Sequence, residues 1–325
     1  MPESAPKHDS EVTEWFGGLT TWLEGRYSST VHDDRAPGLH ASGLGKLCGR
    51  RRFLAAIFGE NHIPHTAGNY FTFDVGHSLH WWWQERYLGP KQELWGDWVC
   101  MGCPCPGCGR AVSQPGVTRE LRREVTQRCG ACRGTGGKVT RGLMPLDCEC
   151  GKPWQVAVHY LELPVVNKEL SYVGHADGIL NHKPKRRLFE FKTISPSEYD
   201  KLKGPQAEHI IQMHAYMQPL GLEEAIIVYE NKGSQCKWKV NMFGQFEALE
   251  PKITPYLIKF DDEVWNGIVA RIKEDHRARI CLQEIMDSGK QPTRLDVAKF
   301  PRTCEDKKCN LAARCPVSRE CFHVD

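Results

Sequence analysis

Residues 188–194 read LFEFKTI, and hydrophobic and charged side chains alternate along them. Successive side chains of a β-strand point to opposite faces, so Phe189 and Phe191 would share one face and Glu190 and Lys192 the other. The alternation predicts a strand whose apolar face is buried. A sheet with one hydrated face has the same pattern, so this stretch alone does not tell a hydrated face from a reactive one.

The segments around this strand predict an α/β (α+β) fold. A helix, three strands, a helix and a strand follow one another, which is typical of a central mixed sheet flanked by helices. The apolar run EAIIVYE indicates a strand buried on both faces. Strands are predicted at 154–163, 171–180, 186–194 and 224–230, and helices at 11–27, 44–60, 75–88, 207–220 and 255–288.

The composition is that of a globular protein, with 325 residues, 40% hydrophobic and 26% charged. The formal charge of +3 demands no anionic partner, but basic residues cluster at 183–187 and at 119–141, where seven Lys or Arg face two Glu. No run of about 18 apolar residues is present, and the N-terminus lacks a signal-peptide pattern. We therefore expect no membrane association and a cytoplasmic location, in the host if the protein is phage-encoded.

Fifteen cysteines predict metal binding, because a reducing compartment disfavours a disulfide framework. Eight lie between positions 100 and 150 and four between 304 and 321, while Cys48, Cys236 and Cys281 stand apart. Residues 96–151 also contain many glycines, prolines and basic residues and few core formers. This composition predicts an insertion that folds around metal.

The insertion has the paired spacing of zinc ribbons. Two C-x2-C units form the centre, and two further pairs flank them and would close a second site. We expect one or two structural Zn²⁺ sites of four thiolates each, with an interleaved pairing left open. The predicted ligands are Cys100, Cys103, Cys105, Cys108, Cys129, Cys132, Cys148 and Cys150. The basic side chains of the insertion either contact phosphates or form a hydrated surface.

A second group of polar residues surrounds the opening stretch. The turn after GHADGIL would place Asp177 on a strand beside Glu190, with Lys192 two residues further on. Two carboxylates and a lysine at a sheet edge can hold a hard divalent cation and position a water molecule. A surface ion pair plus a turn aspartate is the alternative, because Asp-Gly is a turn signal.

Two predicted helices carry polar residues at helical spacing. Gly76, His80 and Gln84 lie at i, i+4 and i+8, and Gln212 and Tyr216 at i, i+4. A core histidine and the polar edge of an amphipathic helix are the alternatives. The tryptophans at 81–83 would suit base stacking. Three successive helical residues face different ways, however, so we expect most of their surface in the core.

The ordered set G-x3-H-x3-Q, GHADG, E-F-K-T and Q-x3-Y resembles the RecB-like branch of the PD-(D/E)xK nuclease superfamily, which includes AddAB nuclease domains, CRISPR-associated adaptation nucleases and phage exonucleases. The resemblance covers roughly residues 42–325 apart from the insertion, with Gly-His-Ala-Asp in place of Pro-Asp. It implies a restriction-endonuclease-like core. It also implies that Mg²⁺ or Mn²⁺ is bound by His80, Asp177, Glu190 and the Phe191 carbonyl.

The same resemblance implies roles for the remaining residues of the set. Lys192 would orient the attacking water and stabilise charge on the phosphate. Gln212 and Tyr216 would contact DNA and support the site.

The resemblance further implies a [4Fe-4S] cluster held by one cysteine before the core and three after it. Cys48, Cys315 and Cys321 match this pattern, whereas Ala312 stands at the position of the remaining cysteine. Cys309, or Cys304 as the alternative ligand, would replace it. A Zn²⁺ site made of the four tail cysteines is the other interpretation.

Together these features predict a metal-dependent DNA nuclease, an exonuclease on single strands or duplex ends that serves recombination, repair or phage DNA processing. A non-cleaving DNA-binding scaffold is the alternative. The expected partners are DNA and a recombinase, helicase or single-strand-binding protein. The predicted domains are an N-terminal helical part (1–95), the insertion (96–151), the nuclease core (152–300) and a cysteine-rich tail (301–325).

Overall fold

The computed structural model describes the chain in separate ranges. The described residues are 18, 21, 38–59, 67–100, 138–146, 158–181, 185–233, 238–240, 246–248, 252–304, 312 and 315–322. Cys309 and every predicted zinc ligand except Cys100 lie outside the part that is described, as does the helix predicted at 11–27 apart from residues 18 and 21.

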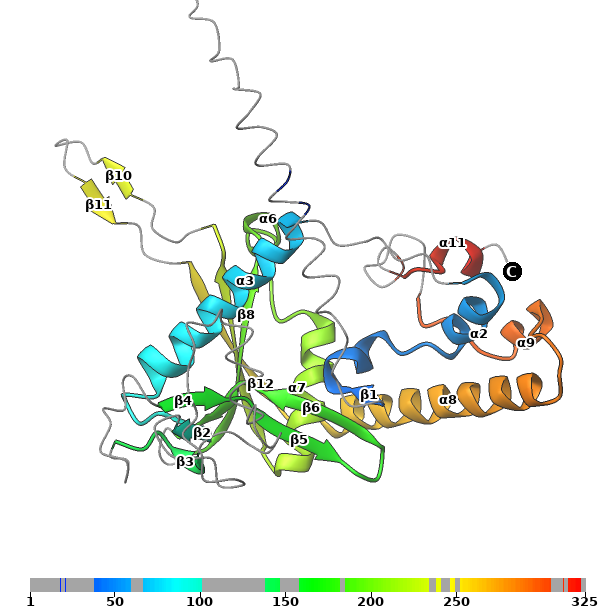
Figure 1. The fold of residues 1–325 in the computed structure, drawn as a ribbon, viewed down its shortest axis with the longest axis horizontal. Helices are drawn as coiled ribbons and strands as arrows, with labels where there is room; N and C mark the ends of the chain where they lie inside the picture. Colours follow the sequence, from blue (N-terminus) through cyan, green and yellow to red (C-terminus); the bar gives the residue numbers. More distant parts are fainter. Residues whose placement is uncertain are drawn as a thin grey trace, which may run out of the picture.

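A mixed β-sheet forms the centre of the molecule, which confirms the predicted fold class (Figure 1). Its main path runs β12-β9-β8-β7-β2-β3, and β4 also pairs with β2. Strands β8 and β9 are parallel, and the other pairs in this sheet are antiparallel. The bounds are β2 Leu94–Cys100, β3 Lys138–Leu143, β4 Val158–Leu161, β7 Gly178–Leu180, β8 Arg187–Ile194, β9 Glu224–Asn231 and β12 Ile253–Lys259.

A smaller sheet continues from the large one. It has the order β1-β6-β5, with β1 at Leu39–His40, β5 at Leu163–Asn167 and β6 at Tyr172–Ala176. The strand predicted at 171–180 is therefore two strands that belong to different sheets. Asp177 lies at the break, before Gly178, whose φ of +145° is a conformation that favours glycine. A separate hairpin pairs β10 (Trp238–Val240) with β11 (Phe246–Ala248).

Helices cover both sides of the large sheet. Figure 1 shows α3 and α7 on opposite sides of β8. The side chains of β8 alternate between two cores, because Leu188 and Ile194 pack in the core that includes α7, while Phe189 and Phe191 pack in another. The bounds are η1 Ala41–Lys46, α2 Gly49–Phe58, α3 Ala67–Trp81, the π-helical segment η2 Trp82–Leu88, α6 Pro196–Tyr199, α7 Ala207–Leu220, α8 Asp262–Asp287, α9 Arg294–Ala298 and α11 Ser318–Cys321.

The segment predicted to be mostly helical, 255–288, is helical from Asp262 to Asp287, but its first residues form a strand. Residues 253–259 form β12, which pairs antiparallel with β9 along its whole length. Pro255 is tolerated there because β12 is an edge strand. The helix α8 begins after Asp261, whose carboxylate accepts a hydrogen bond from the Glu263 amide at 2.8 Å.

A third core lies at one end of α8, where α2, α9 and α11 gather (Figure 1). It is anchored by Arg52, which donates to buried Asp275 with an Nη2 to Oδ2 distance of 2.6 Å. The ion pair ties the helix that follows Cys48 to α8. Within the described segments, no helix is both long enough and apolar enough to cross a membrane.

Candidate active site

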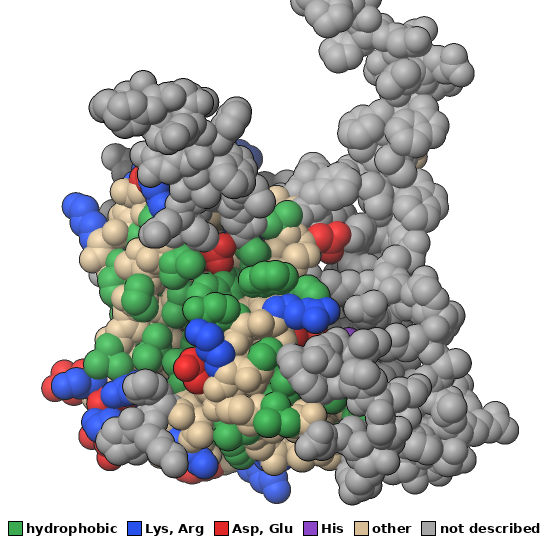
Figure 2. All heavy atoms as spheres, turned by 90° about the vertical axis from the view of Figure 1, so that its left-hand side faces the viewer, with side chains coloured by type: hydrophobic (Ala, Val, Ile, Leu, Met, Phe, Trp, Pro, Cys, Tyr) green, Lys and Arg blue, Asp and Glu red, His purple; other side chains and the backbone are tan. Residues whose placement is uncertain are grey.

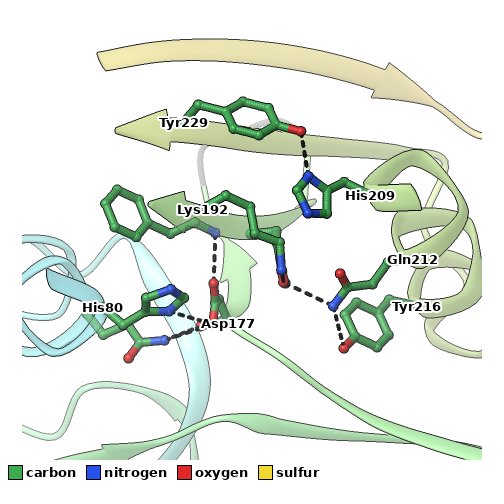
Figure 3. Close-up of polar contacts among 10 residues, drawn as sticks. His80, Asp177, Lys192, His209, Gln212, Tyr216 and Tyr229 are labelled. Atoms are coloured by element: carbon green, nitrogen blue, oxygen red, sulfur yellow. Dashed lines mark hydrogen bonds and ion pairs between the residues drawn. The ribbon is translucent and has the colours of Figure 1, made fainter. Parts of the chain in front are cut away.

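The site forms where β7 stops pairing with β8. The last paired residues are Gly178 and Phe189. One residue before β7, the Asp177 carboxylate accepts a hydrogen bond from the Phe191 amide at 2.7 Å. It thus takes the place of the backbone carbonyl that a longer β7 would offer to this amide. This contact places Asp177 against β8, next to the residue that follows Glu190. Figure 3 shows the Asp177 carboxylate beside His80.

The junction of α3 and η2 supplies the next two side chains. His80 Nδ1 lies 3.1 Å from Asp177 Oδ1. Gln84 Nε2 donates to the Asp177 carbonyl at 3.2 Å. The π-helical segment begins at Trp82, between these two residues, and π-helical turns are frequent at functional sites.

Helix α7 closes the other side of the site. Gln212 Nε2 donates to Glu190 Oε1 at 3.2 Å and to Tyr216 Oη at 2.9 Å. The Tyr216 ring packs against Gly174, where a Cβ atom would lie only 2.6 Å from the Tyr216 Cε1 atom. The glycine of the GHADG stretch therefore makes room for this tyrosine.

Glu190 and Lys192 form a close ion pair on the α7 side of β8. Their Oε1 and Nζ atoms are 2.6 Å apart. The Glu190 and Asp177 side chains are 4% and 5% exposed, whereas Lys192 and His80 keep 22% and 25%. The two carboxylates are thus buried, whereas the two nitrogen groups are partly exposed. Glu190 Oε2 is buried and has no hydrogen-bond partner among the described residues.

Burial and neighbouring charges shift the pKa values of the site residues in opposite directions. Burial raises the pKa of Glu190 to about 7, although the charge of Lys192 acts in the other direction. Burial also disfavours ionisation of Asp177, but the charge and hydrogen bond of His80 hold its pKa below the ordinary value. In turn, Asp177 raises the pKa of His80 against the effect of burial. The result is one carboxylate held ionised and a second that binds a proton readily.

These residues suit a divalent cation in kind, because carboxylates are good donors for Mg²⁺ and Mn²⁺, and a neighbouring imidazole favours Mn²⁺. Within the described chain, however, no three His, Cys, Asp or Glu side chains are already arranged to hold a metal ion. The reason is visible in the contacts, since Glu190 is paired with Lys192 and Asp177 with His80. A cation would therefore have to compete with Lys192 for Glu190.

Two features near the site were missed by the sequence analysis. After the effects of burial and Asp177, the charge of Glu162 further raises the pKa of His80, so this carboxylate lies within electrostatic range. On α7, His209 Nδ1 lies 2.7 Å from Tyr229 Oη (Figure 3). The sequence offers two signals for them, because Glu162 is the second-last residue of a predicted strand and His209 lies three residues before Gln212.

The expectation that most of the tryptophan surface lies in the core fails for Trp82 but is confirmed for Trp83, which packs against the core that contains Phe191. Trp82 is 56% exposed, and Trp81 and Trp83 are each half-buried. Trp83 donates to Glu230 at 3.0 Å and packs against Phe191, with ring centroids 5.4 Å apart. Successive helical residues face different ways, so one of the three rings is directed away from the core.

The described cysteines fall at two places. Cys100 ends β2 and is buried. In the third core, burial raises the pKa of Cys321, and the charges of Arg50, Cys48 and Cys315 also act on this thiol. Thr303 Oγ1 donates to the Leu47 carbonyl at 3.2 Å, which brings the segment before Cys304 to the residue before Cys48. The fold thus gathers the front and the tail of the chain at one end of α8.

Comparison with known proteins adds little. No family model and no curated protein matches the chain. An alkaline exonuclease from Laribacter hongkongensis, LHK-Exo, is 15% identical at a TM-score of 0.29, and the match covers 40% of this chain and 61% of the exonuclease. The same enzyme in complex with dAMP is 12% identical at a TM-score of 0.26, over 76% and 97% of the two chains. The protein SSO0001 is 15% identical at 0.38, over 92% and 96%. With TM-scores below 0.5, these likenesses do not assign a function.

Proposed function

We propose that the protein is a metal-dependent deoxyribonuclease that hydrolyses phosphodiester bonds. The observation that carries this proposal is the buried Glu190 carboxylate, which is paired with Lys192 at 2.6 Å and lies on the strand that Asp177 caps. A buried carboxylate oxygen without a partner among the described residues is costly unless a ligand satisfies it. A cation bound there would supply that interaction.

The residues of the site have distinct roles in this proposal. Asp177, Glu190 and His80, with the Phe191 carbonyl, would hold Mg²⁺ or Mn²⁺. The bound ion would polarise the phosphodiester and lower the pKa of a water molecule. Lys192, released from Glu190, would direct the water and stabilise negative charge on the phosphate. Gln212 would keep Glu190 oriented through its 3.2 Å hydrogen bond, and Tyr216 would hold Gln212.

The direct test replaces Lys192 by alanine and measures degradation of labelled DNA with Mg²⁺ or Mn²⁺. We expect activity to fall by about 10²- to 10³-fold, the effect of removing a group that stabilises developing charge. Lys185→Ala is the matched control, because Lys185 forms a similar lysine–glutamate pair with Glu224 at 2.7 Å, just before the same strand. Wild-type degradation by the Lys192 variant would contradict the proposal.

A finer proposal is an exonuclease of the RecB-like type, on single strands or duplex ends. Digestion of 5′- and 3′-labelled single-stranded and duplex DNA would show whether single nucleotides leave from an end. A non-cleaving scaffold would instead bind DNA without degrading it in Mn²⁺.

We further propose that a [4Fe-4S] cluster lies at the end of α8. Cys315 and Cys321 belong to the third core, and the charge of Cys48 acts on the Cys321 thiol, which supports the proposal. The Thr303–Leu47 hydrogen bond brings the segment of Cys304, the alternative fourth ligand, close to Cys48, whereas Cys309 lies outside the described residues. No three described cysteines are already arranged around a metal position, so the thiolates would have to move together to bind the cluster. Protein purified without air should be brown and contain about four irons per chain, and Cys304→Ser should lose them. Colourless wild-type protein that carries only zinc would contradict the cluster. The same elemental analysis would count the Zn²⁺ ions proposed for the insertion.

A further inference from the structure

The outer side of the α3–η2 junction carries a strip of exposed aromatic and cationic residues, Trp82, Arg86, Tyr87 and Lys91. Trp82 and Tyr87 are 56% and 45% exposed. Arg86 and Lys91 are also exposed. We call these four residues the aromatic strip. Large aromatic side chains gathered on a surface mark an interaction site more often than isolated ones do.

Cations and rings are interleaved along the strip. The Arg86 guanidinium lies 4.8 Å from the centre of the Trp81 ring, and Lys91 Nζ lies 4.1 Å from that of Tyr87. Glu85, the acidic residue of η2, is directed inward instead, because its carboxylate accepts a hydrogen bond from the Tyr160 amide at 2.8 Å. The strip therefore offers flat apolar faces beside positive charge.

Figure 2 views the molecule from the side on which α3 and β3 lie in Figure 1. Hydrophobic side chains gather across the middle of this face, with lysine and arginine side chains and a few acidic ones beside them. Such a surface suits a ligand that has both flat apolar groups and negative charge.

A continuous series of ring contacts joins the strip to the candidate active site. Tyr87 packs against Trp83 with ring centroids 5.2 Å apart, Trp83 packs against Phe191 at 5.4 Å, and Phe191 packs against His80 at 5.2 Å. The segment that presents the strip also carries His80 and Gln84. A ligand on the strip would therefore be held by the element that forms one wall of the site.

We propose that the aromatic strip binds single-stranded DNA, with bases stacked on Trp82 and Tyr87 and phosphates beside Arg86 and Lys91. This inference rests on the proposed nuclease function and names the substrate class. The two aromatic positions are five residues apart, about one turn of the π-helical segment, which leaves room for one base at each ring. Stacking needs no particular base, so the strip binds the strand regardless of sequence. Duplex DNA keeps its bases stacked on one another and cannot use the rings.

The test measures binding of a fluorescein-labelled 20-nucleotide oligo-dT by anisotropy, in EDTA so that no cleavage occurs. Trp82→Ala and Tyr87→Leu should each weaken binding by about 5- to 150-fold, the effect of one lost base stack. Both side chains are exposed, and leucine keeps the apolar bulk of Tyr87, so the fold should persist. Phe58→Ala is the matched control, because Phe58 is 44% exposed and lies under Arg294 at 5.8 Å, in α2. It should change binding by less than about twofold.

The contribution of Arg86 and Lys91 can be measured separately, from the salt dependence of DNA binding. The double variant Arg86→Gln/Lys91→Gln should make the dependence of log affinity on log salt shallower by about 1.4, because each phosphate contact to a single strand contributes about 0.7. Affinity for a duplex of the same length should fall less than affinity for oligo-dT when the rings are removed. An unchanged salt slope together with unchanged oligo-dT binding would overturn the proposal.

Hydrolysis of a small phosphodiester, thymidine 5′-p-nitrophenyl phosphate, in Mn²⁺ separates the two proposals. Trp82→Ala should leave this rate unchanged while it slows degradation of oligo-dT. If the wild type hydrolyses neither substrate but the ring variants still lose oligo-dT binding, the nuclease function fails and the strip stands. If the ring variants bind and degrade oligo-dT like the wild type, the strip proposal fails and the function stands. Variants that change only the sedimentation of the protein would make the strip a contact between copies, which also overturns the proposal.

Discussion

Replacing Glu190 by glutamine should remove a pH-dependent loss of stability from the metal-free protein. Burial raises the pKa of Glu190 to about 7, from an ordinary value of 4.5. The folded state therefore binds this proton more tightly than the unfolded state does. The stability that Glu190 contributes is fully present below pH 4.5 and is lost as the pH rises through 7.

The size of the effect follows from these two values. They differ by about 2.5, and one pKa unit corresponds to about 1.4 kcal/mol, so ionising Glu190 costs the fold about 3 kcal/mol. Glutamine has a similar shape and no charge at any pH. The difference in unfolding free energy between the wild type and Glu190→Gln should therefore shift by about 3 kcal/mol between pH 4.5 and pH 8, in favour of the variant.

Urea unfolding followed by tryptophan fluorescence, in EDTA and at several pH values, measures this difference. Glu224→Gln is the control, and its effect on stability should depend on pH in the opposite direction, because hydrogen bonds from Lys185 and Arg187 lower the pKa of Glu224. The contribution of Glu224 is present above its unfolded pKa and is lost as the pH falls through its folded value. Parallel stability curves for the wild type and Glu190→Gln would refute the reasoning.

Two further substitutions test the packing that supports the site. Gly174→Ala would place a methyl group 2.6 Å from the Tyr216 ring and should lower the free energy of unfolding by about 1–3 kcal/mol. Adding Tyr216→Leu should recover part of this loss. An unchanged melting temperature for Gly174→Ala alone would contradict this expectation. Arg52→Met leaves the buried Asp275 carboxylate without its cation and should cost about 3–5 kcal/mol. As the control, Lys299→Met breaks the exposed ion pair with Asp296 and should lower the free energy of unfolding by less than about 1 kcal/mol. Equal losses for the Arg52 and Lys299 variants in urea unfolding would show that burial of Asp275 does not matter.

The site residues with a local signal could be predicted from the sequence. The alternation of LFEFKTI places Phe191 opposite Glu190 and Lys192 whatever lies around the strand, because successive strand side chains face opposite ways. Helix α7 matches its predicted bounds, 207–220, because the spacing of Gln212 and Tyr216 repeats with the helical turn. The strand 224–230 was also predictable from its unbroken apolar run.

Other features depend on contacts between distant segments. The predicted strand 171–180 is divided between two sheets, and the division at Asp177 lets its carboxylate bond the Phe191 amide. No local pattern marks that break. Residues 253–259 form a strand because β9 offers them an edge, although their own sequence was interpreted as the start of a helix.

The sequence by itself determined which side chains share a face, because strand and helix periods are properties of the backbone and act within a few residues. Only the tertiary structure decided that His80, Asp177, Glu190 and Gln212 meet at the end of β7, since this depends on how α3 and α7 pack on either side of β8. It also decided which of the three tryptophans is exposed, since this depends on which side of the α3–η2 segment packs against the sheet. Burial then changes the chemistry of the gathered groups, because removal from water raises the pKa of the Glu190 carboxyl group to about 7.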